Sequence, residues 1–91
     1  MQISDITPVI LTYNEEPNIA RVLAQLSWAR DVVVVDSHSR DRTRQIVANF
    51  PNTRFFEHAF ETHAAQWTYA ISQTGIASEW ILALEIGRAH V

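Results

Sequence analysis

The hydrophobic positions of this chain fall into short apolar runs separated by segments with helical periodicity. The clearest run spans residues 31–36, where four successive valines stand between two aspartates. An apolar run without alternation is typical of a strand buried on both faces of a parallel sheet. Three further runs, 6–12, 53–57 and 80–84, predict additional strands, and the last of them is again apolar on both sides.

The segments between these strands repeat apolar residues at the spacing of a helix face. After the first strand, the repeat from Ile19 to Leu26 predicts a helix of about 10–12 residues with one buried face, and Asn14 is its expected N-cap. Ser39 is expected to cap a second helix in the same way. A third helix is predicted over residues 62–73.

The predicted elements alternate, beginning and ending with a strand. This order indicates an α/β fold with three layers, in which a mostly parallel sheet of about four strands carries helices on both faces. Ligands of such sheets bind outside the carboxyl ends of the strands. We therefore looked for chemistry at residues 12–15, at residues 36–39 and after Leu84.

The composition excludes several classes of protein. The 91 residues suffice for one domain, and the absence of Cys excludes a disulfide framework and a thiolate nucleophile. Because the chain has only two Gly, neither GxGxxG nor a Walker loop can occur. The formal net charge of −3 argues against nucleic acid as a partner, and no apolar run is long enough to span a membrane.

The first candidate site follows the first strand. Thr12, Tyr13, Asn14 and Glu15 offer a hydroxyl, an aromatic ring, an amide and a carboxylate near a predicted helix start. Such a set could hold a base, a ribose or a phosphate. The alternative is that these residues cap the helix and that Tyr13 packs.

The second candidate site follows the valine strand. The carboxylate of Asp36 could accept hydrogen bonds from a base or a ribose hydroxyl, or it could simply cap the following turn. His38 lies two residues further on and is a candidate for the same pocket. Arg40 is the cation closest to this turn. The histidines show no metal-ligand spacing.

These two segments together resemble the opening of the family 2 glycosyltransferases. Residues 9–15 end in Thr-Tyr-Asn-Glu, and residues 33–43 follow the pattern V-V-D-S-x-S-x-D-x-T. The resemblance covers residues 5–84 and implies the N-terminal, nucleotide-binding half of a Rossmann-like GT-A fold. The members that it is most similar to are related to lipopolysaccharide core glucosyltransferases.

The resemblance implies a transferase activity. Members of the family move a sugar, with inversion, from a nucleotide-diphosphate donor such as a UDP-sugar to the hydroxyl of a carbohydrate or lipid-linked acceptor. For this chain, that implies a place in cell-envelope polysaccharide or lipopolysaccharide synthesis, in the cytoplasm at the inner face of the membrane.

The resemblance also assigns roles to particular residues. Thr12, Tyr13 and Glu15 would line the nucleotide pocket, and Asp36 would hydrogen-bond the base, which is uracil in most members. Many members carry A-Q-R-N at a later position, where this chain has Gln66 followed by Trp67 in place of the Arg. We therefore expect Trp67 to belong to the core.

The end of the fourth strand departs from the family pattern. Members end this strand in Asp-x-Asp, which holds a divalent cation, Mg²⁺ or Mn²⁺, that neutralises the leaving diphosphate. Here Glu85 and Gly87 stand at the two positions, so the pair is not intact. The resemblance thus predicts a cation in a full-length parent protein and an inactive chain in this form.

The last six residues suggest an explanation for this departure. Residues 86–91 are the translation of ATC GGA AGA GCA CAC GTC, which belongs to a widely used short-read sequencing adapter. Residues 1–85 would then be the truncated nucleotide-sugar-binding part of a transferase domain, and residues 86–91 a non-native tail. Two functions stay open: a glycosyltransferase fragment, or a non-catalytic nucleotide-binding or structural α/β module.

Overall fold

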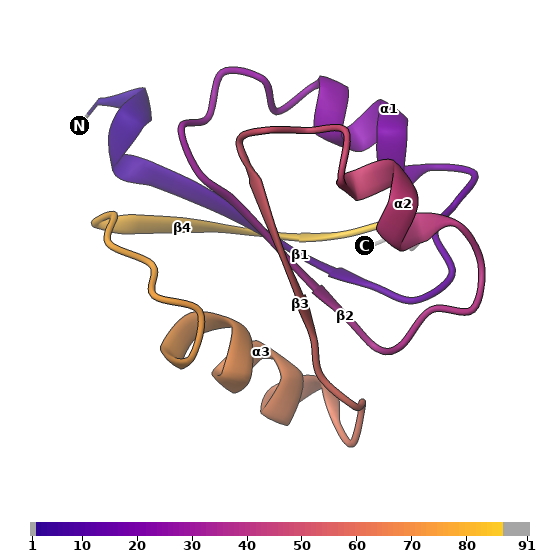
Figure 1. Ribbon diagram of the computed structural model, residues 1–91. Coiled ribbons are helices and arrows are strands. Elements are labelled where there is room, and N and C mark those ends of the chain that lie inside the picture. The colour runs from indigo at the N-terminus through magenta and orange to yellow at the C-terminus, as the bar shows by residue number, and fades with distance from the viewer. Residues whose placement is uncertain (1, 87–91) are drawn as a thin grey trace.

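The structure is a computed structural model that describes residues 2–86, in which four parallel strands form one sheet (Figure 1). The strands are β1 (Ile6–Thr12), β2 (Val32–Asp36), β3 (Thr53–Glu57) and β4 (Trp80–Glu85), and a short 3-10 turn, η1 (Ile3–Asp5), precedes β1. Their order across the sheet is β3-β2-β1-β4. The four predicted strands are confirmed.

Three helices cover the sheet, with α1 (Ile19–Ala24) and α2 (Thr43–Val47) on one face and α3 (His63–Ser72) on the other (Figure 1). This arrangement confirms the predicted three-layer α/β fold. Within residues 2–86, no helix combines the length and the apolar character that a membrane crossing requires.

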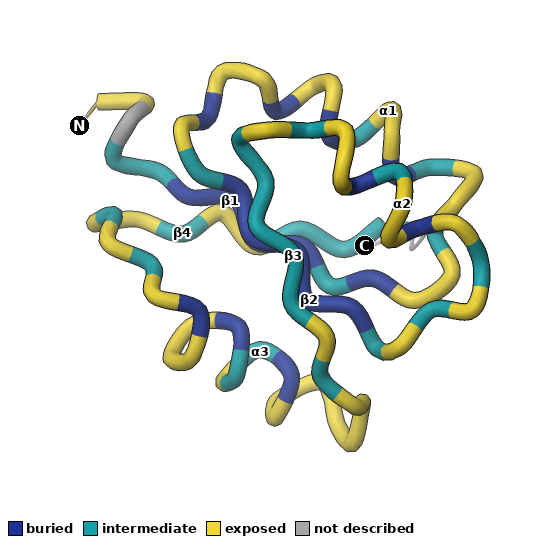
Figure 2. Tube along the Cα trace, in the orientation of Figure 1, coloured by how far each residue is buried: buried dark blue, intermediate teal, exposed yellow. Residues whose placement is uncertain are grey.

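The two cores of the molecule lie on the two faces of β2. Every residue of this strand is buried, as the dark blue tube at the centre of Figure 2 shows. Val32 and Val34 face the core under α1 and α2, whereas Val33 and Val35 face the core under α3. Trp67 packs against the second core, as expected. The four successive valines of β2 therefore contribute side chains to both cores.

The first helix is shorter than predicted, because the chain before it forms a turn. α1 has six residues and begins after Asn18, whereas we expected about 10–12 residues and Asn14 as the N-cap. Asn14 has a positive φ of 51°, and the carbonyl of Glu15 closes a turn by accepting the N–H groups of Asn18 and Ile19. Leu26 lies beyond the helix but is still buried, so the predicted apolar face is present.

The expected cap of the second helix is also wrong. α2 follows Arg42, and the hydroxyl of Ser39 donates to Asp36 Oδ1 at 2.5 Å. Asp41 supports the helix start, because its Oδ1 accepts the N–H of Thr43 at 3.0 Å. The hydroxyl of Ser39, which we expected to cap this helix, is thus bonded within the turn after β2.

The apolar run of β4 is not buried on both sides as predicted. This strand pairs only with β1 and forms an edge of the four-stranded sheet. Trp80 and Leu82 are 54% and 41% exposed, while Leu84 and Ile81 pack against the two cores. Of the proposed tail, residues 87–91 lie outside the described part of the chain.

Candidate functional site

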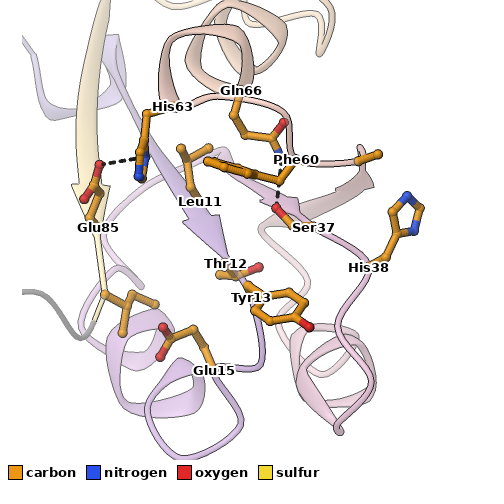
Figure 3. A pocket seen from close by; sticks show the side chains of 12 residues that line it. Leu11, Thr12, Tyr13, Glu15, Ser37, His38, Phe60, His63, Gln66 and Glu85 are labelled. Atoms are coloured by element: carbon orange, nitrogen blue, oxygen red, sulfur yellow. Dashed lines mark hydrogen bonds and ion pairs between the residues drawn. The ribbon is translucent and has the colours of Figure 1, made fainter.

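A pocket of about 560 Å³ opens at the carboxyl ends of the strands (Figure 3). Four segments surround it: the loop that follows β1, the loop that follows β2, the segment that follows β3, and the end of β4. This is the edge at which parallel sheets of this kind bind their ligands. The residues that line it are Leu11, Thr12, Tyr13, Glu15, Ser37, His38, Ala59, Phe60, His63, Gln66, Glu85 and Ile86.

Asp36 lies behind this pocket and organises the turn after β2. Its side chain is 1% exposed, and its Oδ1 accepts the hydroxyl of Thr12 at 2.7 Å. The hydroxyl of Ser39 also donates to Oδ1, and the N–H of Ser39 donates to Oδ2 at 2.6 Å. A buried carboxylate is costly unless it is hydrogen-bonded, and these donors satisfy both of its oxygens. The observed contacts are those of a turn cap, and contact of Asp36 with a base stays a prediction.

The loops after β1 and β2 hold each other through reciprocal hydrogen bonds. We call residues 12–16 and 36–43 together the loop clasp. The N–H of Asn14 donates to Ser39 Oγ at 2.7 Å, and the N–H of Arg40 donates back to Asn14 Oδ1 at 2.8 Å. The left-handed backbone of Asn14 suits this position, because Asn tolerates positive φ better than most residues.

Further bonds extend the loop clasp to the start of α2. The N–H of Glu15 donates to Thr43 Oγ1 at 2.9 Å, and the N–H of Glu16 donates to Asp41 Oδ2 at 3.0 Å. In return, Glu16 Oε1 accepts the N–H of Arg42 at 3.0 Å. Side-chain and backbone polar groups of the two motif segments are therefore engaged with each other along the whole contact.

These contacts lower the pKa of Asp41. Partial burial raises the pKa of this carboxyl, but the hydroxyl and N–H of Thr43 and the N–H of Glu16 all donate to the charged form. The donors outweigh the burial, so the pKa lies below its ordinary value. The hydrogen bonds to Asp41 therefore favour its ionised form.

Five residues of the loop clasp line the pocket: Thr12, Tyr13, Glu15, Ser37 and His38. Tyr13 is 55% exposed and presents its ring at the mouth, and the carboxylate of Glu15 lies beside it (Figure 3). His38 has a positive φ of 59°, and its Nδ1 lies 3.5 Å from Glu57 Oε2. Tyr13, Glu15 and His38 can contact a ligand while hydrogen bonds between neighbouring residues hold the loops in place.

The opposite side of the pocket is built by residues 58–66, which we call the β3–α3 wall. The rings of Phe60 and His63 meet edge to face, with centroids 5.1 Å apart. Gln66 is 1% exposed and bridges Ser37 to His58. Thr62 caps α3 by accepting the N–H of Ala65, which orients the first turn of the helix toward the pocket.

The predicted site residues divide into two groups. Thr12, Tyr13, Glu15 and His38 line the pocket, whereas Asn14 and Asp36 lie in the loop clasp outside the lining. Arg40 is not part of the lining either. Sequence reasoning missed Phe60 and left His63, a histidine near a predicted loop, out of the site, although both follow the carboxyl end of β3 and the same rule about strand ends could have found them.

The described residues do not fit a bound divalent cation. Within residues 2–86, no three His, Asp or Glu side chains come together in a way that could hold a metal ion. Glu85, at the first position of the expected pair, lies 3.9 Å from His63 Nδ1. Asp36 already accepts three hydrogen bonds. We therefore derive no chemical step through a metal.

Comparison with known proteins identifies the family. The profile described as glycosyl transferase family 2 matches residues 7–84, which include both motif segments, β2, β3, and all but one residue each of β1 and β4. The chain belongs to this family of glycosyltransferases. A comparison with curated proteins found no significant match.

Proposed function

We propose that this chain is the nucleotide-sugar-binding part of an inverting glycosyltransferase that uses a UDP-sugar donor. The observation that carries the proposal is that the family match coincides with a pocket at the carboxyl ends of β1 and β2. An acceptor hydroxyl on a carbohydrate or a lipid-linked molecule would attack the anomeric carbon, and the nucleoside diphosphate would leave from the opposite side. The proposed setting is synthesis of cell-envelope polysaccharide or lipopolysaccharide, in the cytoplasm at the inner face of the membrane.

The shape and chemistry of the pocket support a nucleotide as the ligand. Tyr13, His38, Phe60 and His63 surround it with planar rings, against which a base can stack. Its two carboxylates, Glu15 and Glu85, are unfavourable for a diphosphate alone, and no Arg within residues 2–86 lines the pocket. The Mg²⁺ or Mn²⁺ that we expect in a longer parent protein, with an intact Asp-x-Asp pair, would supply that missing positive charge.

A titration with UDP tests the proposal. We expect UDP to raise the melting temperature of the chain and to bind measurably in calorimetry. Replacing Tyr13 with Ala removes an exposed ring from the mouth and should weaken UDP binding about tenfold, the order of one stacking contact. The matched control is Trp28→Ala, because Trp28 is 40% exposed but lies outside the pocket lining. Absence of UDP binding, or equal binding by the Tyr13 variant, contradicts the proposal.

A second function is favoured by one feature of the sequence. Because Glu85 and Gly87 stand where the family carries its two Asp residues, the chain as it stands would bind a nucleotide without transferring sugar. Both functions expect this chain to bind UDP without releasing UDP from UDP-sugars, so turnover in the presence of Mn²⁺ and simple sugar acceptors is the outcome that distinguishes them. Turnover under those conditions would exclude the non-catalytic function.

A further inference from the structure

The two edges of the sheet differ in their protection against pairing with another chain. At one edge, β3 carries Arg54 and Glu57, whose charged ends form ion pairs with Asp31 and Arg44, each at 2.8 Å. Long charged side chains on an edge strand hinder the addition of a further strand. At the other edge, β4 has neither a cation nor a Pro, and its one charged residue, Glu85, is the last. β4 is therefore the less protected edge.

β4 also leaves apolar side chains exposed. Trp80 and Leu82 are exposed, and the alternation of a strand places them on the same face as Leu84, which packs against the core under α1 and α2. Of the helices, α3 packs over β1 and β2, and α2 packs over β3. No residue of β4 is fully buried, and the tube is yellow and teal along this strand in Figure 2. An apolar edge of this kind is a surface on which another strand can pair.

A second copy of this chain fits this edge, because the pairing of β4 with itself closes. A two-fold axis perpendicular to the sheet places two β4 strands side by side and antiparallel, so that the outward-facing backbone groups of each strand bond to those of the other. Pairing of β4 with β3 of another copy would instead run head to tail and leave a free edge at both ends. The two-fold pair uses only the unprotected edge of each copy.

The acidic residues around β4 favour one register of such a pair. Residues opposite each other in an antiparallel pair share a face of the sheet, so the axis that pairs most of this six-residue strand passes beside Leu82 or beside Ala83. The register centred on Leu82 would place Glu79 opposite Glu85 of the other copy, and like charges opposite each other destabilise a strand pair. The register centred on Ala83 places Glu85 opposite Ile81 and avoids this repulsion.

We propose that β4 is a self-association surface, through which two copies of this chain pair antiparallel in the register centred on Ala83. The pairing joins the two four-stranded sheets into one continuous sheet. Because only six residues of each strand take part, the interface is small, and we expect a dissociation constant on the order of 100 µM. The proposal rests on the edge of the sheet and holds whether or not the chain binds a nucleotide.

Sedimentation equilibrium of the whole chain, from about 10 µM to about 1 mM, tests the association. We expect monomers at the low concentration and dimers at the high one. Leu82→Lys places a charge on the edge and should weaken the association at least about tenfold, whereas Ile71→Lys, at an exposed position of α3, should not. A wild-type chain that stays monomeric, oligomers larger than dimers, or equal weakening by the two variants overturns the proposal.

Single cysteines test the register, since the chain has no Cys of its own. In the proposed pair, Ala83→Cys stands opposite its equivalent with about 4.5–5.5 Å between the Cα atoms, within reach of a disulfide, whereas Leu82→Cys is diagonal to its equivalent. With oxidised glutathione as the oxidant, Ala83→Cys should form linked dimers at least about fivefold faster than Leu82→Cys or Ala77→Cys, an exposed position before β4. Equal rates at the three positions, or the fastest rate at Leu82→Cys, overturn the proposed pairing.

Reversal of one charge tests why this register is favoured. Glu79→Arg would place opposite charges across the register centred on Leu82. In that background we expect the rate of disulfide formation to rise for Leu82→Cys and to fall for Ala83→Cys. Glu61→Arg, an exposed charge reversal outside β4, is the matched control and should leave both rates unchanged. An unchanged preference for Ala83→Cys in the Glu79→Arg background contradicts the assignment of the register by charge.

Discussion

The two sides of the pocket are built in different ways. In the loop clasp, motif residues hydrogen-bond one another across two loops, and only a few side chains are left facing the ligand. In the β3–α3 wall, one buried amide holds the segment while the aromatic side chains of Phe60 and His63 face the pocket. The motif residues of this chain thus mainly hold the two loops in place, and only some of them face the ligand.

The strongest test of this comparison is the removal of the buried carboxylate of the loop clasp. Asp36→Ala leaves the Thr12 hydroxyl and the Ser39 N–H without their acceptor, so we expect a loss of about 2–4 kcal/mol in the free energy of unfolding. Urea denaturation measures the loss, and the exposed Glu61→Ala should stay within about 0.5 kcal/mol of the wild type. An Asp36 variant as stable as wild type would show that the clasp does not depend on this carboxylate.

Removal of the buried amide makes the equivalent test of the β3–α3 wall. Gln66→Leu leaves the His58 carbonyl and the His58 Nδ1–H unpaired, and we expect a loss of about 2 kcal/mol in unfolding free energy. The same denaturation experiment measures it, with the exposed Gln73→Leu as control. A loss of unfolding free energy larger than that of Asp36→Ala would contradict our expectation that the loop clasp contributes more to stability than the β3–α3 wall.

Substitutions at Asn14 separate its hydrogen bond from its backbone conformation. Asn14→Gly keeps the positive φ and loses only the bond to the N–H of Arg40, so we expect a cost of about 0.5–1.5 kcal/mol. Asn14→Ala should cost about 1 kcal/mol more, because Ala resists the left-handed region. Thermal denaturation of both variants distinguishes the two contributions. Equal stability of the Gly and Ala variants would show that the left-handed backbone at position 14 does not destabilise the Ala variant.

The smallest expected effect is the pH dependence that comes from Asp41. Its pKa is lowered in the folded chain, so its contribution is fully present above the ordinary carboxyl pKa of about 3.9 and is lost as the pH falls through the lower folded value. Urea denaturation at a series of pH values should show wild type and Asp41→Asn converging in stability as the pH falls below about 4. A difference that is constant across that range would show that ionisation of Asp41 does not support the clasp.

Much of the fold could be predicted because the hydrophobic pattern indicates which segments form strands and which faces are buried. The valines of β2 indicated a strand buried on both faces, and the structure places that strand between two cores. The equally apolar run at Trp80 and Leu82 suggested the same burial, but apolar character does not tell whether a strand lies at the centre or the edge of a sheet. That depends on strand order, which arises from packing over the whole chain.

The candidate site was predicted in part for a similar reason. Thr12, Tyr13, Glu15 and His38 line the pocket, because the ends of parallel strands meet at one edge of the sheet. Asn14 could not be placed from sequence, because its side chain bonds to a loop 26 positions further along the chain. The rule about strand ends points to the segment after β3, but it does not tell which side chains of that segment, Phe60 and His63 among them, turn toward the pocket.

The central claim is that the pocket between the loop clasp and the β3–α3 wall binds the nucleotide of a sugar donor. The most direct test is an NMR titration of the chain with UDP, which locates the ligand residue by residue. A second pocket of about 400 Å³, lined in part by Ala77, Ser78 and Glu79, serves as an internal control. We predict saturable shifts of the amide signals at Tyr13, Ser37 and Phe60 with none at Ala77–Glu79. Shifts centred on the second pocket, or none at either, would contradict the account.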